Sequence, residues 1–395
     1  MTENVVILSG VRTAIGAFGG SLKDIPPAKL GNIVIREAVA RAGLSVDEVE
    51  HVVMGQVIPT VPQDAYLARV AALGAGIPDS APALTLNRLC GSGLQAIISA
   101  AQMLKLGEAE IAVAGGAESM SRSPHYVASA RFGQKMGDIA IIDALTTTLS
   151  DPLDGYHMGI TAENVADRYQ ITRADQDAAA AESQRRASKA IAEGRFKEQI
   201  VAVEIETRKG VTIFDTDENV RAETTAEGLS QLRPVFKKGG TVTAGNASTI
   251  NDAAAALLLA TEASAQARGL QARARILAWG HAGVEPSVMG IGPLKAVPIA
   301  LKRAGLTLDQ IDIIESNEAF AAQACAVAQG LGFDPDKTNV NGSGISLGHP
   351  VGATGAILVV KLMHELDRIQ GRYGLATMCI GGGQGIALVI ERLPT

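Results

Sequence analysis

The sequence has 395 residues, which is long enough for two or three domains' worth of core. Its 47% hydrophobic and 19% charged residues are typical of a globular protein, and the net charge of −6 argues against a broad nucleic-acid-binding surface. The three cysteines form no CxxC pair, no secretory leader precedes the first apolar run, and stretches such as GAILVVKLM are too short to span a bilayer. We therefore expect a cytoplasmic protein that binds neither nucleic acid nor membrane.

Two stretches of the chain repeat each other. AVARAGLSVDEVEHVV (38–53) aligns with ALKRAGLTLDQIDIIE (300–315), and both carry RAGL, a hydroxyl residue, an aspartate and then an apolar strand. Each is followed by a strand-to-helix joint, at CGSGLQAI and at GHPVGATGAI, and each half closes on a strand that runs into glycines, within 110–119 and 375–385. Strands that alternate with helices indicate βαβ units, so we predict a duplicated α/β fold with parallel sheets.

The stretch 121–250 interrupts this pattern and is predicted to be a loop-rich insertion in the first half. It contains a charged helix that begins near Thr172, where TRAD resembles a capping box. The domain prediction is therefore an N-terminal half of residues 1–120 plus 251–270, an inserted loop domain of residues 121–250, and a C-terminal half of residues 271–395.

Cys90 lies in LTLNRLCGSG, where a strand-like alternation gives way to helical spacing. The start of a helix supplies unpaired N–H groups and a favourable dipole, which would stabilise a thiolate. The alternative is a small buried residue at a tight turn, because free cysteines usually pack in cores.

Three residues of the second half also follow predicted strands. His349 precedes Pro350 at a glycine-rich joint equivalent to that of Cys90, where a histidine could accept a thiol proton. Cys379 ends a strand before GGGQG, and a thiol there could serve as an acid or base near neutral pH. Asn317, in ESNEAF, could cap the helix that follows it. Taken singly, each also fits a structural role.

Metal and nucleotide chemistry find no support in the sequence. DTDENVRAETTAE begins like a calcium loop but lacks the glycine and glutamate that such a loop requires. There is no HExxH, no zinc-type cysteine spacing and no GxxxxGK[ST]. We therefore expect no metal and no cofactor.

Together, NRLCGSG, NEAF, GHPVGATG and CIGGGQG closely resemble the thiolase family, and VRTAIGAFGG, GGAESMS, HMGITAENVA, FDTDE, LRPVF and TAGNAS match it along the rest of the chain. The resemblance implies the five-layered αβαβα thiolase fold, coenzyme A thioesters as substrates, and a homotetramer.

The resemblance also implies roles for individual residues. Cys90 would be the acylated nucleophile, His349 would activate it, and Cys379 would move the proton at the substrate α-carbon. Asn317 would hold a water that, with His349, stabilises the enolate oxygen, and the N–H groups of Cys90 and Gly381 would form a second oxyanion hole. The residues implied along the acyl and coenzyme A path are His157, Met158, Arg221, Phe236, Ala244, Ser248 and Phe320.

The activity expected from this resemblance is the reversible condensation of two acetyl-CoA into acetoacetyl-CoA and coenzyme A, through an acyl-cysteine. Met158 in HMG resembles short-chain members. One alternative is a degradative 3-ketoacyl-CoA thiolase of broader chain length. Another is a non-catalytic coenzyme A-binding homologue, although no reactive group is missing. Ketoacyl synthases pair their cysteine with two histidines, or a histidine and an asparagine, whereas this chain offers Cys379.

Overall fold

The computed structural model describes residues 3–208 and 210–394, so the outermost residues of the two predicted halves lie outside it, as does residue 209 of the insertion. Its centre is a continuous sheet with the strand order β13-β14-β15-β12-β1-β11-β5-β3-β4. The first half supplies β1 (Val5–Thr13), β3 (His51–Gly55), β4 (Ala83–Leu86), β5 (Ile111–Ser119) and β11 (Asn251–Thr261). The second half supplies β12 (Ala274–Gly283), β13 (Ile313–Ser316), β14 (Tyr373–Ile380) and β15 (Gln384–Arg392).

The strand order confirms the duplication. The run β3-β5-β11-β1 of the first half is matched by β13-β14-β15-β12 of the second, and the halves meet where β1 pairs with β12. The repeated hydroxyl residues have the same local role, because Ser45 and Thr307 each form a capping box on a 3₁₀ turn, η1 (Val46–Glu48) and η5 (Leu308–Gln310).

The prediction of parallel sheets is only partly correct. β3 pairs in parallel with β4 and β5, and β13 with β14, but the inner strands pair antiparallel. At β14–β15 the cause is local: the strands are joined by a tight turn through Gly382 and Gly383, whose φ values of 77° and 86° suit glycine. A tight turn makes consecutive strands antiparallel.

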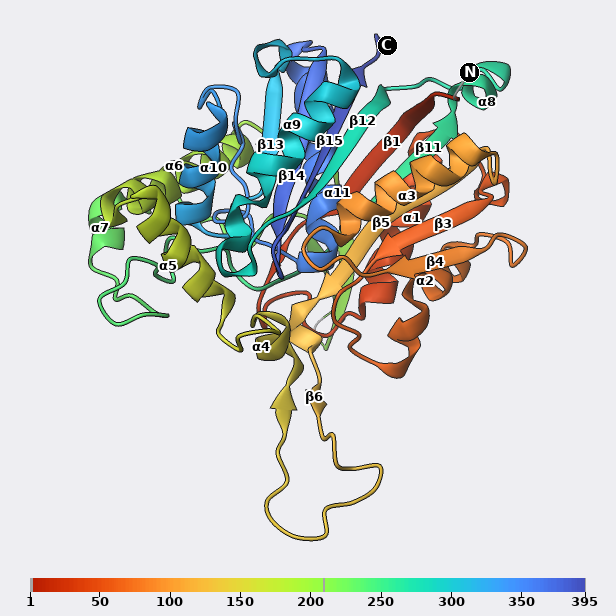
Figure 1. Cartoon of the computed structure of the whole chain (residues 1–395). Helices are drawn as coiled ribbons and strands as arrows, with labels where there is room; N and C mark the ends of the chain where they lie inside the picture. Colours follow the sequence, from red (N-terminus) through yellow and green to blue (C-terminus); the bar gives the residue numbers. More distant parts are fainter. Residues whose placement is uncertain (1–2, 209, 395) are drawn as a thin grey trace.

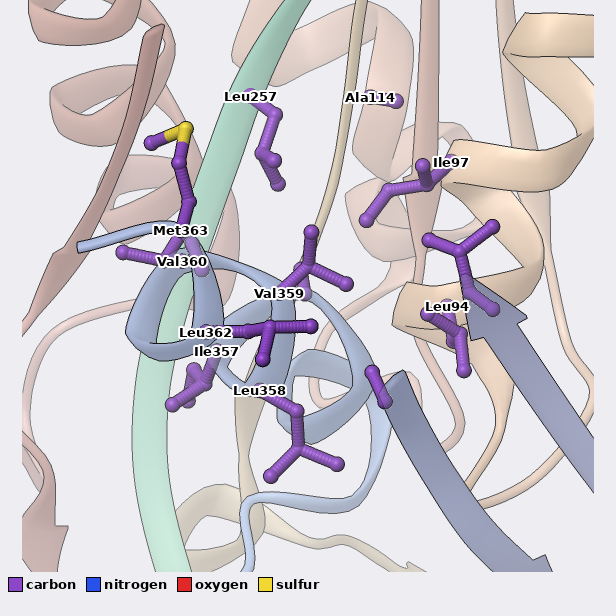
Figure 2. Packing of buried hydrophobic residues seen from close by; sticks show 14 of the residues in the cluster. Leu94, Ile97, Ala114, Leu257, Ile357, Leu358, Val359, Val360, Leu362 and Met363 are labelled. Carbon is purple, nitrogen blue, oxygen red and sulfur yellow. The ribbon is translucent and has the colours of Figure 1, made fainter. Parts of the chain in front are cut away.

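Helices form the other layers (Figure 1). The outer layer of the first half is α1 (Pro27–Arg41) and α2 (Leu67–Ala75), and that of the second half is mainly α9 (Gly292–Ala304). Between the two sheet halves lie α3 (Ser92–Leu106) and α11 (Val351–Ile369), whose apolar side chains form the largest core with strands of both halves (Figure 2). This gives the αβαβα layering of the predicted fold. Within the described residues, no helix has the length and apolar character needed to cross a membrane.

The two central helices touch at glycines. A Cβ at Gly93 would lie 2.7 Å from the backbone nitrogen of Ala356, and one at Gly355 would lie 2.2 Å from that of Leu94. Only glycine permits this approach. It brings the N-terminal ends of α3 and α11 together, and therefore brings together the two joints that carry Cys90 and His349.

The segment 121–250 is a structured insertion against one end of this core. It contains α4 (Ala144–Thr148), α5 (Met158–Tyr169), α6 (Arg173–Ala192), α7 (Ala226–Ser230), and the short strands β6 (His125–Tyr126), β7 (Ile142–Asp143), β8 (Ile200–Val201), β9 (Val203–Thr207) and β10 (Gly210–Phe214). As predicted, α6 begins after Thr172, which forms a capping box with Asp175. Helices α5 and α6 pack on α10 (Ala321–Leu331), and the chain between β6 and β7 extends away from the body (Figure 1).

The remaining short elements are β2 (Gly16–Ala17), α8 (Glu262–Ala267), η2 (Pro62–Tyr66), η3 (Met120–Arg122) and η4 (Pro286–Ile291).

Candidate active site

A sharp turn presents Cys90 directly before Gly91, the N-cap of α3. Leu89 adopts the left-handed conformation with φ 47°, which is unusual for a residue with a branched side chain. Two side chains hold the turn: Asn87 Oδ1 accepts from Leu89 N at 2.8 Å, and Ser92 Oγ donates to the Leu89 carbonyl at 2.6 Å. Strain of this kind persists where surrounding contacts enforce it, and here the strained turn carries a cysteine that lines a cavity.

The Cys90 thiol is protonated at rest, contrary to the expectation from the helix dipole. Burial raises its pKa above the ordinary value, and the N–H groups of Gly381 and of Cys90 itself, which face the sulfur, oppose this only in part. Desolvation disfavours the charged form more than two partial charges favour it. To act as a nucleophile, this thiol would therefore need a base that accepts its proton.

His349 is a neutral imidazole, because burial lowers its pKa to about 4. Its Nδ1 lies 2.7 Å from the hydroxyl of Thr354, and that hydroxyl donates to the Pro350 carbonyl at 2.9 Å. A hydroxyl has one proton to donate, so it accepts from His349 Nδ1–H. The unprotonated nitrogen is then Nε2, which is free to accept a proton.

Asn317 lies beside this nitrogen, with its Nδ2 3.4 Å from His349 Nε2. The alternative role of Asn317 as a helix cap is excluded, because the N-cap of α10 is Phe320 and the Asn317 amide faces the imidazole instead. Once Nε2 carries a proton, the imidazole and the amide form two neighbouring N–H donors. Two such donors can stabilise a developing oxyanion. Pro350, directly after His349, is the N-cap of α11.

Cys379 lies at the end of β14 and is fully buried among Met158, Met289 and Phe320. Burial raises the pKa of its thiol far above the usual range, and the neighbouring Cys90 adds to this shift. The resting thiol is therefore protonated at neutral pH, and the role of Cys379 as an acid or base stays a prediction. Its thiolate, once formed, would be a strong base.

These groups meet at a cavity of about 210 Å³ whose wall is mostly apolar. Cys90, Gly381 and His349 line it, together with predicted residues His157, Met158, Phe236, Ser248 and Phe320. Cys379 and Asn317 lie behind this wall. Arg221 and Ala244 are exposed and outside the cavity lining, so the structure does not bring these two to the reactive groups.

An aromatic stack forms one side of the cavity. The rings of His157 and Phe236 are stacked with centroids 4.6 Å apart, and Phe236 meets Phe320 edge-on at 6.3 Å. His157 is also the N-cap of α5, since its Nδ1 accepts from Gly159 N at 3.0 Å. The stack thus links the insertion to the NEAF loop, where Ser248 N donates to the Ala319 carbonyl at 2.9 Å.

Sequence reasoning missed several residues of this site. Thr354, which sets the His349 tautomer, could have been found as a hydroxyl one helical turn after Pro350. Leu149 and Met289 line the cavity, but nothing in their local sequence distinguishes them from core residues. Glu118 could have been noticed as a carboxylate in an otherwise apolar strand, GGAES.

The fold, and the family models that match it, define the class of acyl-transferring enzymes to which the chain belongs. Family models described as the thiolase N-terminal domain and the thiolase C-terminal domain match residues 5–263 and 270–392. The chain belongs to the thiolase family. It is 61% identical to beta-ketothiolase BktB of Cupriavidus necator over 100% of both chains, and 50% identical to an acetyl-CoA acetyltransferase of Pseudomonas aeruginosa over 99% of this chain and 100% of that one.

Solved structures show the same fold. Acetyl-CoA acetyltransferase of Bacillus anthracis superposes with a TM-score of 0.97 at 47% identity, covering 99% of both chains. Human mitochondrial 3-ketoacyl-CoA thiolase in complex with CoA superposes with a TM-score of 0.97 at 42% identity, covering 100% of this chain and 99% of that one. The predicted family and fold are thereby confirmed.

Proposed function

We propose that this thiolase catalyses the reversible condensation of two acetyl-CoA into acetoacetyl-CoA and coenzyme A, through an acyl group on Cys90. The observation that carries the proposal is that the Cys90 thiol and the neutral imidazole of His349 line one apolar cavity, while the Cys379 thiol is buried directly behind its wall and close to Cys90. The names of the relatives, which include acetyl-CoA acetyltransferases, support the same substrates.

The first half-reaction forms the acyl-enzyme. Cys90 passes its proton to His349 Nε2, and its sulfur attacks the thioester carbonyl. The N–H groups of Cys90 and Gly381 face this sulfur and are placed to bind the resulting oxyanion. Coenzyme A then leaves as a thiolate and takes the proton of Cys379, which leaves a Cys379 thiolate and a His349 imidazolium.

The second half-reaction forms the carbon–carbon bond. The Cys379 thiolate removes a proton from the α-carbon of a second acetyl-CoA, and the enolate oxygen is stabilised by His349 Nε2–H with Asn317 beside it. The carbanion attacks the acyl group on Cys90, and the departing Cys90 sulfur takes the proton from His349. All protons return to their starting atoms. The chain supplies nucleophile, base and oxyanion donors, so we propose that no cofactor takes part.

The test separates the two cysteines. In Cys379→Ser, exchange of labelled coenzyme A with acetyl-CoA should continue, because His349 can return its own proton to the leaving thiolate. Thiolysis of acetoacetyl-CoA should fall by ~10²–10⁴ because the general base is lost. Cys90→Ser should abolish both activities, and acid quench after acetyl-CoA should leave acetyl on the Cys90 peptide of the wild type. Equal losses of exchange and thiolysis in Cys379→Ser would refute this division of labour.

Chain length is the open point between the proposed activity and a broader 3-ketoacyl-CoA thiolase. Large apolar side chains line the cavity and take up its space, among them Met158, Leu149 and Met289. We propose a preference for short acyl chains, which thiolysis rates for a series of 3-ketoacyl-CoA esters would measure. Rates that rise steadily with chain length would instead favour the hypothesis of a degradative 3-ketoacyl-CoA thiolase with broader chain length.

We further propose a homotetramer in the cytoplasm. The chain between β6 and β7 exposes large apolar side chains, including Phe132 at 90% and Met136 at 87% exposure, as a subunit contact would require. The three cysteines of the described residues are free thiols, and a reactive thiol such as Cys90 is preserved in a reducing compartment.

A further inference from the structure

Glu118, at the end of β5, is a fully buried carboxylate that no step above uses. It accepts three backbone hydrogen bonds. Oε2 accepts from Val57 N at 2.9 Å and from Gly352 N at 2.9 Å, while Oε1 accepts from Ile58 N at 3.1 Å. The donors come from the loop after β3 and from the first turn of α11, so one side chain ties together two segments far apart in sequence.

Both segments belong to the reactive cavity. Val57 and Val351 line its wall, and Gly352 follows His349 by three residues. The fit at α11 is tight, because a Cβ on Gly352 would lie 2.5 Å from Glu118 Oε2. Glu118 therefore fixes where the first turn of α11 sits, and with it the backbone that carries the imidazole.

A carboxylate is a costly choice for this position if packing were its only purpose, because burial disfavours the charge. Burial raises the pKa of Glu118 to about 8, against its three N–H donors, and the nearby Asp64 carboxyl adds to the increase. The Glu118 charge in turn raises the pKa of the Cys90 thiol. On the neighbouring strand, Asp252 pairs with Ser119 and so lies on the opposite face of the sheet.

We propose that Glu118 is a positioning residue of the reaction. It holds His349 at the correct position relative to Cys90, through its bonds to Gly352 and to the loop at Val57. The inference rests on the proposed function for its kinetic consequences, but its geometric and electrostatic consequences can be measured without turnover.

The variants are Glu118→Gln, which is isosteric and keeps one acceptor oxygen, and Glu118→Ala, which removes all three bonds. The matched control is Glu163→Gln. Glu163 is also a buried carboxylate, and it accepts from Thr241 N at 2.9 Å and Val242 N at 2.8 Å, away from Cys90 and α11. Each variant is assayed for melting temperature, for kcat and KM of acetoacetyl-CoA thiolysis, and for the pH profile of iodoacetamide alkylation at the Cys90 peptide, resolved by mass spectrometry.

Glu118→Gln should lower the pH midpoint of Cys90 alkylation by about one unit. In the wild type, Glu118 is ionised at the pH where the Cys90 thiol titrates, whereas the glutamine carries no charge. Its kcat should fall roughly tenfold with KM little changed, and Glu118→Ala should lose roughly a hundredfold. Glu163→Gln should leave the alkylation midpoint unchanged.

An unchanged midpoint in folded Glu118→Gln, or a kcat equal to that of the wild type, would overturn the inference. If Glu118→Ala fails to fold, the midpoint and kcat of the isosteric Glu118→Gln variant test the inference on their own. If iodoacetamide alkylates Cys90 of the wild type but the wild type does not cleave acetoacetyl-CoA, the proposed function is wrong. The comparison of alkylation midpoints between the wild type and Glu118→Gln still tests the role of Glu118.

Discussion

At the scale of single residues, one hydroxyl decides which nitrogen of the neutral His349 imidazole carries the proton. Thr354 Oγ1 donates to the Pro350 carbonyl and so accepts from His349 Nδ1–H, which leaves Nε2 as the base. Burial keeps the imidazole neutral at physiological pH, since its pKa is lowered to about 4. The base is therefore ready before the substrate arrives.

Replacing Thr354 tests this assignment. In Thr354→Val the acceptor for Nδ1–H is lost while the shape is kept, so the imidazole can adopt the wrong tautomer. The kcat of acetoacetyl-CoA thiolysis should fall by roughly 10–100-fold, whereas Thr354→Ser should stay close to the wild type. Identical kcat values for the valine and wild-type proteins would show that the hydroxyl does not set the tautomer.

At the scale of elements, the insertion is anchored to the central sheet by a buried ion pair. Arg12 of β1 donates to both oxygens of Asp217 at 2.7 and 2.8 Å, and both side chains are 0% exposed. Arg12 also donates to Gln199 Oε1 at 2.8 Å and lies over the ring of Phe196. A single strand thus holds two separate parts of the insertion.

Breaking this pair should destabilise the fold. Asp217→Asn leaves the Arg12 charge buried without a counter-ion, which should cost about 3–5 kcal/mol of unfolding free energy in urea titration. Arg168→Gln is the control, because its partner Glu285 and Arg168 itself are largely exposed, and little change is expected there. A loss in Asp217→Asn no larger than in the control would mean that the buried pair does not anchor the insertion.

At the scale of the whole molecule, the extended chain between β6 and β7 is the most prominent feature that the core does not require (Figure 1). Its apolar side chains face solvent, and they include Ile141 at 68% exposure as well as Phe132 and Met136. Contiguous exposed apolar groups of this kind usually mark a contact with another subunit. Symmetric tetramers are a common way to bury such surfaces.

Shortening this loop tests the assembly. Replacement of residues 128–140 by a brief Gly-Ser linker should lower the mass measured by light scattering from that of a tetramer to that of a smaller oligomer. The melting temperature of the subunit should change little, because none of residues 128–140 belongs to the hydrophobic core. A monomeric wild type, or a shortened variant with the wild-type mass, would contradict the proposal.

The sequence by itself determined what is encoded locally. The joints at Cys90 and His349, the capping box at Thr172 and the repeat that begins with RAGL all depend on residues a few positions apart. Such features follow from backbone geometry and periodicity, so a short window of sequence is enough to specify them.

Only the tertiary structure decided the protonation states and the partners. Burial keeps the Cys379 thiol protonated and His349 neutral, and desolvation of Cys90 at the cavity wall raises its pKa more than the local helix dipole and N–H groups lower it. Asn317 reaches His349 instead of capping a helix, and Glu118 reaches Gly352 across 234 positions of sequence. Desolvation and long-range hydrogen bonds depend on what surrounds a group in space, and that surrounding exists only once both halves have packed on α3 and α11.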